Sequence, residues 1–443
     1  MKACSLAHLN VPTIDIIKEM GNKKKTNEDN YLEYFSFAKA KQIYGDSLPE
    51  EVSDRLKYEL KIIKHRGASG YFLFLQDVVN TAQSELGVWI GPGRGSAAGC
   101  LVCYCLGITK IDPLRHDLLF ERFLNPDGIL FPDIDIDTDN DGRERIMSWL
   151  QQKYGKECCA HIATGKDLHQ CGFVVADEAI SNLASISTLD VEVSSGRRIT
   201  FNCVQNDDIE SSGLIKFDFV GLETLTQLKE ICGLVKMKEG KDLDVEKIPI
   251  DDNRTMIIFQ KGQTDDIFLF SSNEMKRYLQ DFHPTRFEDL VILNCLYRPG
   301  SMDDIAAVIK QKKSKNPIEY IIPSMESVLN NTYGIIVYQE QIMMLSRLIA
   351  NFNKSESALL RMAIGMFKKE MLPALKNQFI RGGTKNGYKK TALEKLWNEI
   401  ESKGKYAFNK SHSVCYTWLA YQMAHLKANF PKEFAQVMEK YHS

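Results

Sequence analysis

The sequence lacks long apolar stretches, since no run of about 18 consecutive apolar residues occurs in its 443 positions. Its first ten residues, MKACSLAHLN, lack the apolar segment of a secretion signal. Internal repeats and low-complexity tracts are also missing. These absences argue against a membrane or secreted protein, and we expect a cytoplasmic one.

Cysteine is present but is not arranged in a framework. The 11 cysteines form an odd number and are scattered along the chain. Cys100 and Cys103 make a C-x-x-C motif, but no second pair of ligands lies nearby, so small buried residues are favoured over a zinc site. The pattern is typical of reduced thiols in a cytosolic protein.

The composition is that of an ordinary globular protein, with 44% hydrophobic and 26% charged residues. The length allows two or three domains with cores of their own. The net charge of −2 hides an asymmetry, because residues 361–443 carry 15 Lys and Arg against 6 Asp and Glu. This basic block suits a surface that binds a polyanion, although charge runs are commonly just solvated faces.

An acidic run, FPDIDIDTDNDG, spans residues 131–142 and invites a divalent cation. Asp137, Asp139, Asp141 and Gly142 follow the spacing of an EF-hand loop. Position twelve of that loop is Ser148, which cannot chelate a cation with two oxygens. A calcium loop is therefore disfavoured.

The first half of the run alternates aspartate with isoleucine. In an extended chain, Asp133 and Asp135 share one face while Ile134 and Ile136 occupy the other. Two-metal phosphoryl chemistry needs such a rigid carboxylate pair, because oxygens must bridge ions only about 3.5–4 Å apart. The alternative is an acidic, solvated edge strand, and this segment alone leaves both interpretations open.

A glycine-rich turn, GPGRGSAAG, lies between an expected strand, VWI, and an expected helix that Ser96 would cap. Glycines let backbone N–H groups approach a phosphate, and a helix N-terminus favours negative charge. Gly93, Gly95 and Ala98 match the loose pattern G-x-G-x-x-A, but no Walker A lysine follows and the next segment does not fit a dinucleotide-binding fold. A purely structural turn is the alternative.

The segment GLIKFDFVGL places Lys216 and Asp218 on one face of a strand, with Phe217 and Phe219 on the other. The two charged groups could form an ordinary ion pair, or a phosphate contact and a third metal ligand. A glycine-serine turn, a D-x-D strand and a later lone aspartate together resemble the palm of polymerase-beta-like nucleotidyltransferases.

The expected elements give an α+β fold with a mixed sheet. Helical periodicity predicts two or three helices over residues 31–86 and another over DGRERIMSWLQQKYG. Three short β-rich runs, GFVVA, RRITF and LIKFDFV, occur between residues 171 and 220. From residue 255 onward the pattern is mostly helical, with loops expected at YRPGS and RGGTKNG.

Seven motifs occur in the order found in the C family of DNA polymerases, the bacterial replicative polymerase III alpha subunits. They are GPGRGSAAG, LLFERFLNP, PDIDID, KFDFVGL, LYRPG, YGIIVYQEQ and FNKSH. The resemblance covers the chain from about residue 31 onward. It implies a template-directed polymerase with a nucleotidyltransferase palm and helical fingers.

The resemblance also implies roles for individual residues. Asp133, Asp135 and Asp218 would be the catalytic aspartates and would hold two Mg²⁺ ions. The nucleotide-binding residues would be Gly95, Ser96, Arg122, Lys216, Arg298, Asn409, Lys410 and His412. The implied substrates are deoxynucleoside triphosphates and primer-template DNA, and a parent protein would work with a sliding clamp and holoenzyme subunits.

The departures from the family bear on activity. We expect a lead-in at residues 1–30, a palm at 31–245 and fingers at 246–443. The family's thumb would be inserted near residues 165–168 and is missing, as are its N-terminal PHP domain and its C-terminal clamp-binding and OB-fold domains. We therefore expect a trimmed core with impaired synthesis. The alternative is a non-catalytic remnant that binds nucleotide or nucleic acid.

Overall fold

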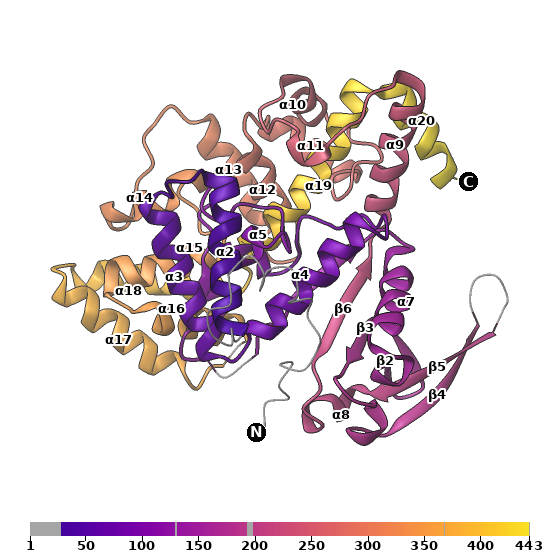
Figure 1. Cartoon of the computed structure of the whole chain (residues 1–443). Coiled ribbons are helices and arrows are strands. Elements are labelled where there is room, and N and C mark those ends of the chain that lie inside the picture. The colour runs from indigo at the N-terminus through magenta and orange to yellow at the C-terminus, as the bar shows by residue number, and fades with distance from the viewer. Residues whose placement is uncertain (1–27, 129–130, 193–197, 367, 443) are drawn as a thin grey trace. The chain divides into compact units, whose positions relative to one another are not determined.

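The computed structural model describes residues 28–128, 131–192, 198–366 and 368–442 (Figure 1). It divides into two compact units. Unit 1 consists of Met1–Leu114 and Phe131–Lys229, and unit 2 consists of Arg115–Leu130 and Glu230–Ser443. The LLFERFLNP motif therefore belongs to the second unit, although it precedes the acidic run in the sequence.

Unit 1 begins with three helices, which confirms the periodicity of its first segment. Helix α4 is buried along most of its length, in keeping with the apolar sequence YFLFLQDVV. The helices of unit 1 are α2 (Glu28–Tyr44), α3 (Glu50–His65), α4 (Ser69–Ser84), α5 (Leu101–Cys105), α7 (Gly142–Tyr154), α8 (Asn206–Ser211) and the first part of α9 (Glu223–Glu239), which continues into unit 2. Its 3₁₀ turns are η2 (Ala97–Gly99), η3 (Lys156–Cys158) and η4 (Ile180–Asn182).

A six-stranded sheet in the order β1-β6-β3-β2-β5-β4 forms the rest of unit 1. Its strands are β1 (Asp135–Thr138), β2 (Cys159–Thr164), β3 (Asp167–Val175), β4 (Ile186–Glu192), β5 (Arg198–Gln205) and β6 (Lys216–Gly221). The β1-β6 and β2-β5 pairs are parallel and the others are antiparallel. This mixed sheet confirms the predicted α+β class, and Figure 1 shows α7 lying beside it.

Aromatic side chains fill the core on one face of this sheet. Phe217 and Phe219 of β6 are fully buried and stack against Phe173 of β3, with ring centroids 5.9 and 5.2 Å apart. Tyr71 and Phe74 of α4 pack on Phe217 at 5.6 and 4.5 Å. The alternation of KFDFVG thus directs its aromatic residues into the core and its charged residues to the opposite face.

Strands β2 and β3 are joined by a two-residue turn at the point where the resemblance places a thumb. Thr164 pairs with Asp167, so only Gly165 and Lys166 lie in the turn. Gly165 has φ +64°, which glycine adopts without strain. Its backbone N–H and carbonyl also bond the side-chain amide of Gln205, at 3.1 and 3.2 Å. The hairpin is therefore closed and tied to β5.

Unit 2 is helical in the parts that the structure describes, as its periodicity predicted. Its helices are α6 (Phe120–Phe123), α10 (Asn253–Gln260), α11 (Asn273–Phe282), α12 (Phe287–Leu296), α13 (Asp303–Lys313), α14 (Glu326–Leu329), α15 (Gln339–Ala350), α16 (Lys354–Gly365), α17 (Leu372–Lys385), α18 (Lys390–Gly404), α19 (Lys410–Asn429) and α20 (Pro431–Met438). Its 3₁₀ turns are η5 (Val245–Lys247), η6 (Pro323–Met325), η7 (Asn330–Thr332) and η8 (Glu439–Tyr441). One apolar core joins α15 to α18 around Trp397.

Two expectations around the glycine-rich turn were wrong. VWI is not a strand, because only Ile90 forms an isolated bridge, with Thr138. Ser96 precedes the 3₁₀ turn η2 and makes no side-chain capping bond. Helix α5 begins later, and its first N–H groups are bonded instead by the buried carboxylate of Glu59 in α3.

The loop expected at RGGTKNG was also wrong, since α17 continues through Lys385. The two glycines serve close packing rather than a turn. A β-carbon at Gly382 would lie 2.0 Å from the carbonyl oxygen of Ala350, and one at Gly383 would meet Leu393.

Among the described residues, no helix combines the length and the apolar character needed to cross a membrane. The cysteines of the described part are free thiols, and most of them, including Cys100 and Cys103, are buried. The burial of Cys100 and Cys103 agrees with the expectation of small buried residues in this motif.

Candidate functional site

Three aspartates converge at one edge of the sheet in unit 1. Strand β1 runs parallel to β6 in a register that places Asp135 beside Asp218. Asp133, two residues before Asp135, shares its face. Each of the three offers a carboxylate oxygen within 4.8 Å of the other two. The structure therefore brings together the three residues that the sequence singled out.

The alternation of the acidic run produces this geometry. Ile134 and Ile136 are each only 2% exposed, whereas Asp133 is exposed and Asp135 half-buried. The N–H of Ile134 donates to the hydroxyl of Tyr71 at 2.9 Å, which anchors the approach to β1 on α4. The strand is an edge strand, as the alternative interpretation supposed, yet its acidic face points to other carboxylates.

Burial and neighbouring like charges raise the proton affinity of two carboxylates of the cluster, Asp133 and Asp135. Burial, followed by the charges of Asp133 and Asp218, raises the pKa of Asp135 to about 6, while Arg94 opposes the change. Burial and the charge of Asp218 likewise raise the pKa of Asp133. Partly buried carboxylates in mutual repulsion are stabilised by a cation.

The donor set fits a divalent cation. Carboxylate oxygens are the hard ligands that Mg²⁺ and similar ions prefer. Asp218 Oδ1 is buried and accepts no hydrogen bond from the described residues. Gly172, the partner of Asp218 on β3, leaves room for this oxygen, since a β-carbon there would lie 3.1 Å from it. His169 Nδ1 lies 3.9 Å from Asp218 Oδ1, and an acceptor atom without a hydrogen bond is suited to a metal bond.

Lys216 and His169 border the cluster. Lys216 Nζ contacts Asp218 Oδ2 at 2.9 Å, so the ion pair considered from the sequence is present. His169 Nε2 lies 3.3 Å from the same amine, and its Nδ1 accepts the N–H of Gly172 at 2.9 Å. His169 was not predicted as a site residue, because a lone histidine in DLHQCGF carries no motif of its own.

The glycine-rich turn lies against the acidic strand within unit 1. The N–H of Gly91 donates to the carbonyl of Asp137 at 2.8 Å, and a β-carbon at Gly91 would lie 2.9 Å from the Asp137 side chain. Gly95 has φ +63°, a left-handed conformation that glycine tolerates. Ser96 is half-buried at the start of η2.

Two further aspartates of the run, Asp137 and Asp139, are held by structural ion pairs. Arg94 contacts Asp137 Oδ1 at 3.2 Å and Asp135 Oδ2 at 3.8 Å. Asp139 is paired with Arg145 at 2.9 Å and with Lys229 at 2.6 Å. These contacts place Asp137 outside the convergent group and give Asp139 no part in a calcium loop.

In unit 2, two sequence motifs come together through backbone pairing. Tyr338 of YGIIVYQEQ forms a parallel bridge with Phe408 of FNKSH. The N–H of Gln339 donates to the carbonyl of Phe408 at 2.9 Å. The buried carboxylate of Glu340 accepts the N–H of Lys410 at 3.0 and 3.1 Å. The two motifs thus form one packed junction.

Cationic side chains surround this junction. Arg122 Nε donates to the side-chain oxygen of Gln339 at 2.8 Å. The Arg298 guanidinium lies 3.3 Å from the ring centroid of Phe408, and its Nε has no hydrogen-bond partner among the described residues. Burial lowers the pKa of Arg122, Arg298 and Lys410. Cations held in a desolvated site bind anions more strongly than solvated ones do.

A further arginine, Arg361 of α16, belongs to the same cluster and was not predicted. Burial, followed by the charge of Arg122, lowers its pKa to about 10, and its Nε lacks a hydrogen-bond partner in the described part. The only signal in the sequence was its place at the start of the basic block.

Two other predicted residues, Asn409 and His412, lie at the start of α19. Asn409 caps this helix by accepting the N–H of Ser411, and the ring of His412 packs on the ring of Tyr416, with centroids 4.2 Å apart.

Two protein families match the chain. Residues 30–170 match the bacterial DNA polymerase III alpha NTPase domain, and residues 224–387 match the bacterial DNA polymerase III alpha subunit finger domain. The first match contains Asp133 and Asp135, and the second contains Arg298 and Arg361. Arg122 lies in the first match but in unit 2 of the structure.

Curated relatives carry the same name. The chain is 33% identical to the DNA polymerase III subunit alpha of Aquifex aeolicus over 88% of the chain and 41% of that protein. It is 34% identical to the subunits of Halalkalibacterium halodurans, over 92% of the chain and 42% of the relative, and of Thermus aquaticus, over 87% and 38%.

The chain spans about two-fifths of the length of the curated relatives it matches. The match with the Aquifex protein extends over 488 residues, which is more than the 443 residues of the chain. The relative therefore contains segments, inside the matched region, that this chain lacks.

Proposed function

Because the chain belongs to the bacterial DNA polymerase III alpha subunit family over its matched regions, we propose that it is the palm and fingers core of a DNA-directed DNA polymerase. Its substrates would be deoxynucleoside triphosphates and primer-template DNA, and it would act in the cytoplasm. A full-length parent would work with a sliding clamp and holoenzyme subunits.

The observation that carries this proposal is the convergence of Asp133, Asp135 and Asp218 on adjacent elements of one sheet. Two Mg²⁺ ions held by these carboxylates would lower the pKa of a primer 3′-hydroxyl and neutralise charge on the transferred phosphate. Asp133 and Asp135 come from one segment, so their spacing is fixed by the backbone. Asp218 comes from a neighbouring strand in fixed register.

The residues proposed to bind the nucleotide form two groups, one within each unit. In unit 1, the turn at Gly95 and Ser96 would face phosphate, and Lys216 would supply a cation beside Asp218. In unit 2, Arg122, Arg298 and Lys410 form a desolvated cationic group, with Asn409 and His412 adjacent in the same segment. The Nε atom of Arg298, which is buried and forms no hydrogen bond with the described residues, supports this assignment.

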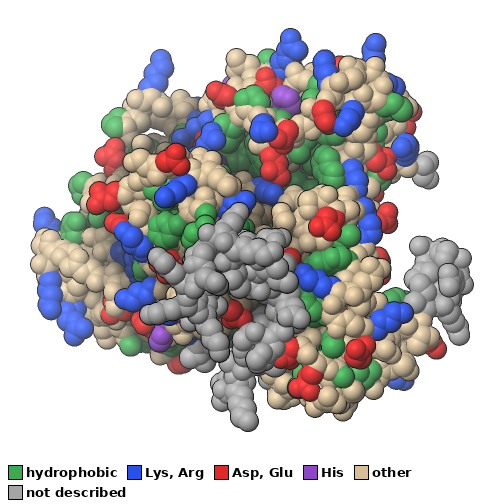
Figure 2. Space-filling view, in the orientation of Figure 1, with side chains coloured by type: hydrophobic (Ala, Val, Ile, Leu, Met, Phe, Trp, Pro, Cys, Tyr) green, Lys and Arg blue, Asp and Glu red, His purple; other side chains and the backbone are tan. Residues whose placement is uncertain are grey.

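Template and primer would be gripped mainly by the basic block after residue 361. Figure 2 shows Lys and Arg side chains gathered over the part of unit 2 that contains α17 and α18. A pocket of about 330 Å³ there is lined by Lys369, Lys376 and Lys405, by Glu401, which accepts the Trp397 N–H, and by apolar side chains. Lysines around an open apolar floor suit the sugar-phosphate backbone of DNA.

We infer that synthesis by this chain is impaired because no thumb holds the duplex. The turn at Gly165 and Lys166 closes the hairpin where such a domain would leave the sheet. The same turn favours a second candidate function, a non-catalytic core that binds nucleotide or nucleic acid.

Primer extension tests the proposal. The unmodified chain should add nucleotides to a labelled primer at a low rate that requires Mg²⁺, and Asp135→Ala should abolish this activity. Asp54→Ala, an exposed carboxylate change in α3, serves as the matched control and should not alter the rate. Absence of extension by the unmodified chain, together with retained triphosphate binding, would select the non-catalytic alternative.

A further inference from the structure

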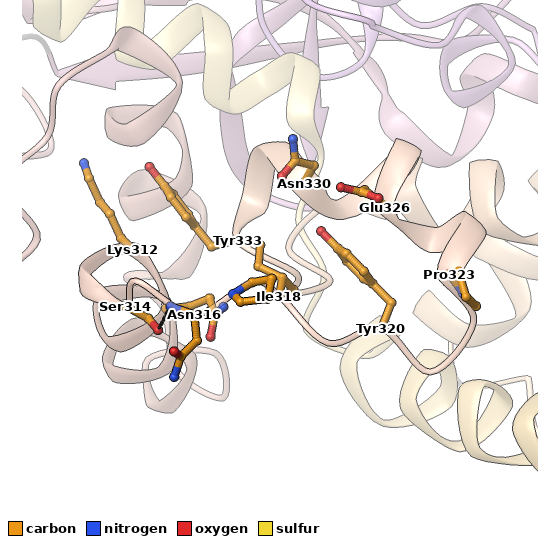
Figure 3. Close-up of a pocket in the computed structure, with 11 residues that line it drawn as sticks. Lys312, Ser314, Asn316, Ile318, Tyr320, Pro323, Glu326, Asn330 and Tyr333 are labelled. Carbon is orange, nitrogen blue, oxygen red and sulfur yellow. Dashed lines mark hydrogen bonds between the residues drawn. The ribbon is translucent and has the colours of Figure 1, made fainter.

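A pocket of about 650 Å³ opens in unit 2 between the end of α13 and the α14–η7 segment. Figure 3 shows two tyrosine rings in its wall, with Ile318 between them. Amide side chains lie on its rim. The lining includes Gln311, Asn316, Ile318, Tyr320, Asn330 and Tyr333, and the carboxylate of Glu326 lies beside Tyr320.

One wall of the pocket is rigidly built. The Tyr333 hydroxyl donates to Asp289 Oδ1 at 2.8 Å, and the Asp289 side chain is fully buried. Lys312 and Arg286 also pair with Asp289. These bonds fix the Tyr333 ring, so this wall is present before any ligand arrives.

The floor is closely packed. Gly334 has φ +82°, and a β-carbon on it would lie 2.6 Å from Ile318. The segment that carries Ile318 and Tyr320 is therefore seated directly on the backbone after η7. The pocket is a packed feature of the fold.

Tyr320 in the opposite wall packs against the hydrophobic core that contains Trp397. Its hydroxyl is buried and forms no hydrogen bond with the described residues. Its ring contacts no other aromatic ring and no cation in the described part of the chain. Buried hydroxyls without partners are rare in native proteins. The pocket thus offers the half-buried ring of Tyr320, whose hydroxyl is left without a hydrogen bond among the described residues.

The chemistry of the rim indicates what the ligand is. Asn and Gln side chains pair with the edges of nucleobases, and base rings stack on tyrosine. Three exposed lysines, Lys310, Lys313 and Lys315, alternate with the rim residues Gln311 and Asn316 along the chain. A planar ring with polar edges and an attached phosphate satisfies all of these groups.

We propose that this pocket binds an unpaired nucleobase on Tyr320, with the adjoining phosphates on the lysines at the end of α13. The source is a single-stranded stretch of DNA, or a free nucleotide with the same base. The inference goes beyond the proposed function, which assigns no role to these residues. It depends on the proposed function in one respect only, because that function identifies the bound strand as the template.

Fluorescence anisotropy with labelled dT12 in EDTA tests the site on the full chain. Tyr320→Leu should weaken binding about fivefold or more, because it removes the stacking face. Tyr320→Phe keeps the ring and should stay within about threefold of the unmodified chain. Tyr34→Leu, at a 40% exposed tyrosine of unit 1, is the control and should change nothing. Competition by dTMP at similar affinity would assign the pocket to free nucleotides, whereas its failure would assign it to the strand.

Photocrosslinking locates the base without relying on a variant. A dT12 oligonucleotide with one 4-thiothymidine should crosslink within residues 314–333. A crosslink only at other positions, or equal affinities for the unmodified chain and a folded Tyr320→Leu variant, would overturn the proposal. EDTA makes the test independent of catalysis, so a chain that binds through Tyr320 but never extends a primer would refute the proposed function alone.

Discussion

The aspartate cluster should cost the metal-free protein stability, and Asp135→Asn should recover part of it. The pKa of Asp135 is raised from 3.8 to about 6 by burial and by the neighbouring carboxylates. At about 1.36 kcal/mol per pKa unit, this difference in pKa lowers the free energy of unfolding by about 3 kcal/mol at neutral pH. Because the side chain is 33% exposed, solvent screening reduces the effect, and we expect a gain of about 1–2 kcal/mol.

The gain should depend on pH in a defined direction. A folded-state pKa above the unfolded one means that the folded chain binds the proton more tightly, so its stability falls as pH rises from about 4 to about 6. Asp135→Asn removes this loss. Its advantage should be nearly full at pH 7.5, about half as large at pH 5, and absent well below pH 4.

Thermal unfolding in EDTA measures the effect. For units of this size, the gain should appear as a rise in Tm of about 2–6 °C at pH 7.5. Addition of 10 mM Mg²⁺ should stabilise the unmodified chain more than the variant, and so should narrow or reverse the difference in Tm between them. Asp54→Asn, at a carboxylate that is 67% exposed, provides the control. A variant that is equally or less stable at pH 7.5 in EDTA would refute the electrostatic reasoning.

Four other outcomes follow from the site. Asp137→Asn should destabilise the fold, because it breaks the contact with Arg94. It should weaken Mg²⁺ binding, measured by calorimetry, much less than Asp135→Asn does, and equal losses of Mg²⁺ affinity would contradict the assignment. Lys216→Ala and Arg298→Ala should each weaken deoxynucleoside triphosphate binding about tenfold or more. Unchanged Kd values for both would place the nucleotide elsewhere. DNA binding should weaken steeply with salt, and Lys405→Gln should reduce the slope of log K against log salt by about 0.9; an unaltered slope would remove this lysine from the DNA surface. A thumb of family length inserted in the β2–β3 turn should raise primer-template affinity and extension rate together, and a thumb-bearing chain without Mg²⁺-dependent extension would refute the polymerase assignment.

The sequence was most informative where chemistry and strand periodicity coincide. The alternation in DIDID and KFD was enough to predict which carboxylates share a face, since side chains of a strand alternate strictly. It could not predict that Asp135 lies beside Asp218, because 83 positions separate them and only the parallel pairing of β1 with β6 decides the register. The family motifs supplied that link.

The errors arose where distant residues replace a local signal. Ser96 looked like a helix cap, but Glu59 from α3 satisfies the N-terminus of α5 instead. Gly382 and Gly383 looked like a loop, but their missing side chains let α17 approach its neighbours closely. A glycine has the same appearance in a sequence whether it serves a turn or a close contact.

Two strands, β2 and β4, were not predicted for different reasons. The first five residues of β2, CAHIA, are all buried, so the strand shows no alternation of apolar and polar residues. Strand β4, ISTLDVE, has its exposed Ile186 at one end and polar residues within it. Strand β4 is therefore defined by its antiparallel pairing with β5, and no pattern in its own sequence indicates it.

The closed hairpin explains how the aspartate site can be formed without a thumb. Asp218 is held from one side by β1 and from the other by β3, where Gly172 is its partner. The turn at Gly165 and Lys166 lies at the far end of β3 from this pairing, and the paired ends of a hairpin are only about 5 Å apart. A domain inserted there, or removed, enters and leaves at nearly the same point and need not shift the strands that carry the carboxylates. Formation of the site and retention of the DNA duplex are therefore separable properties of this fold.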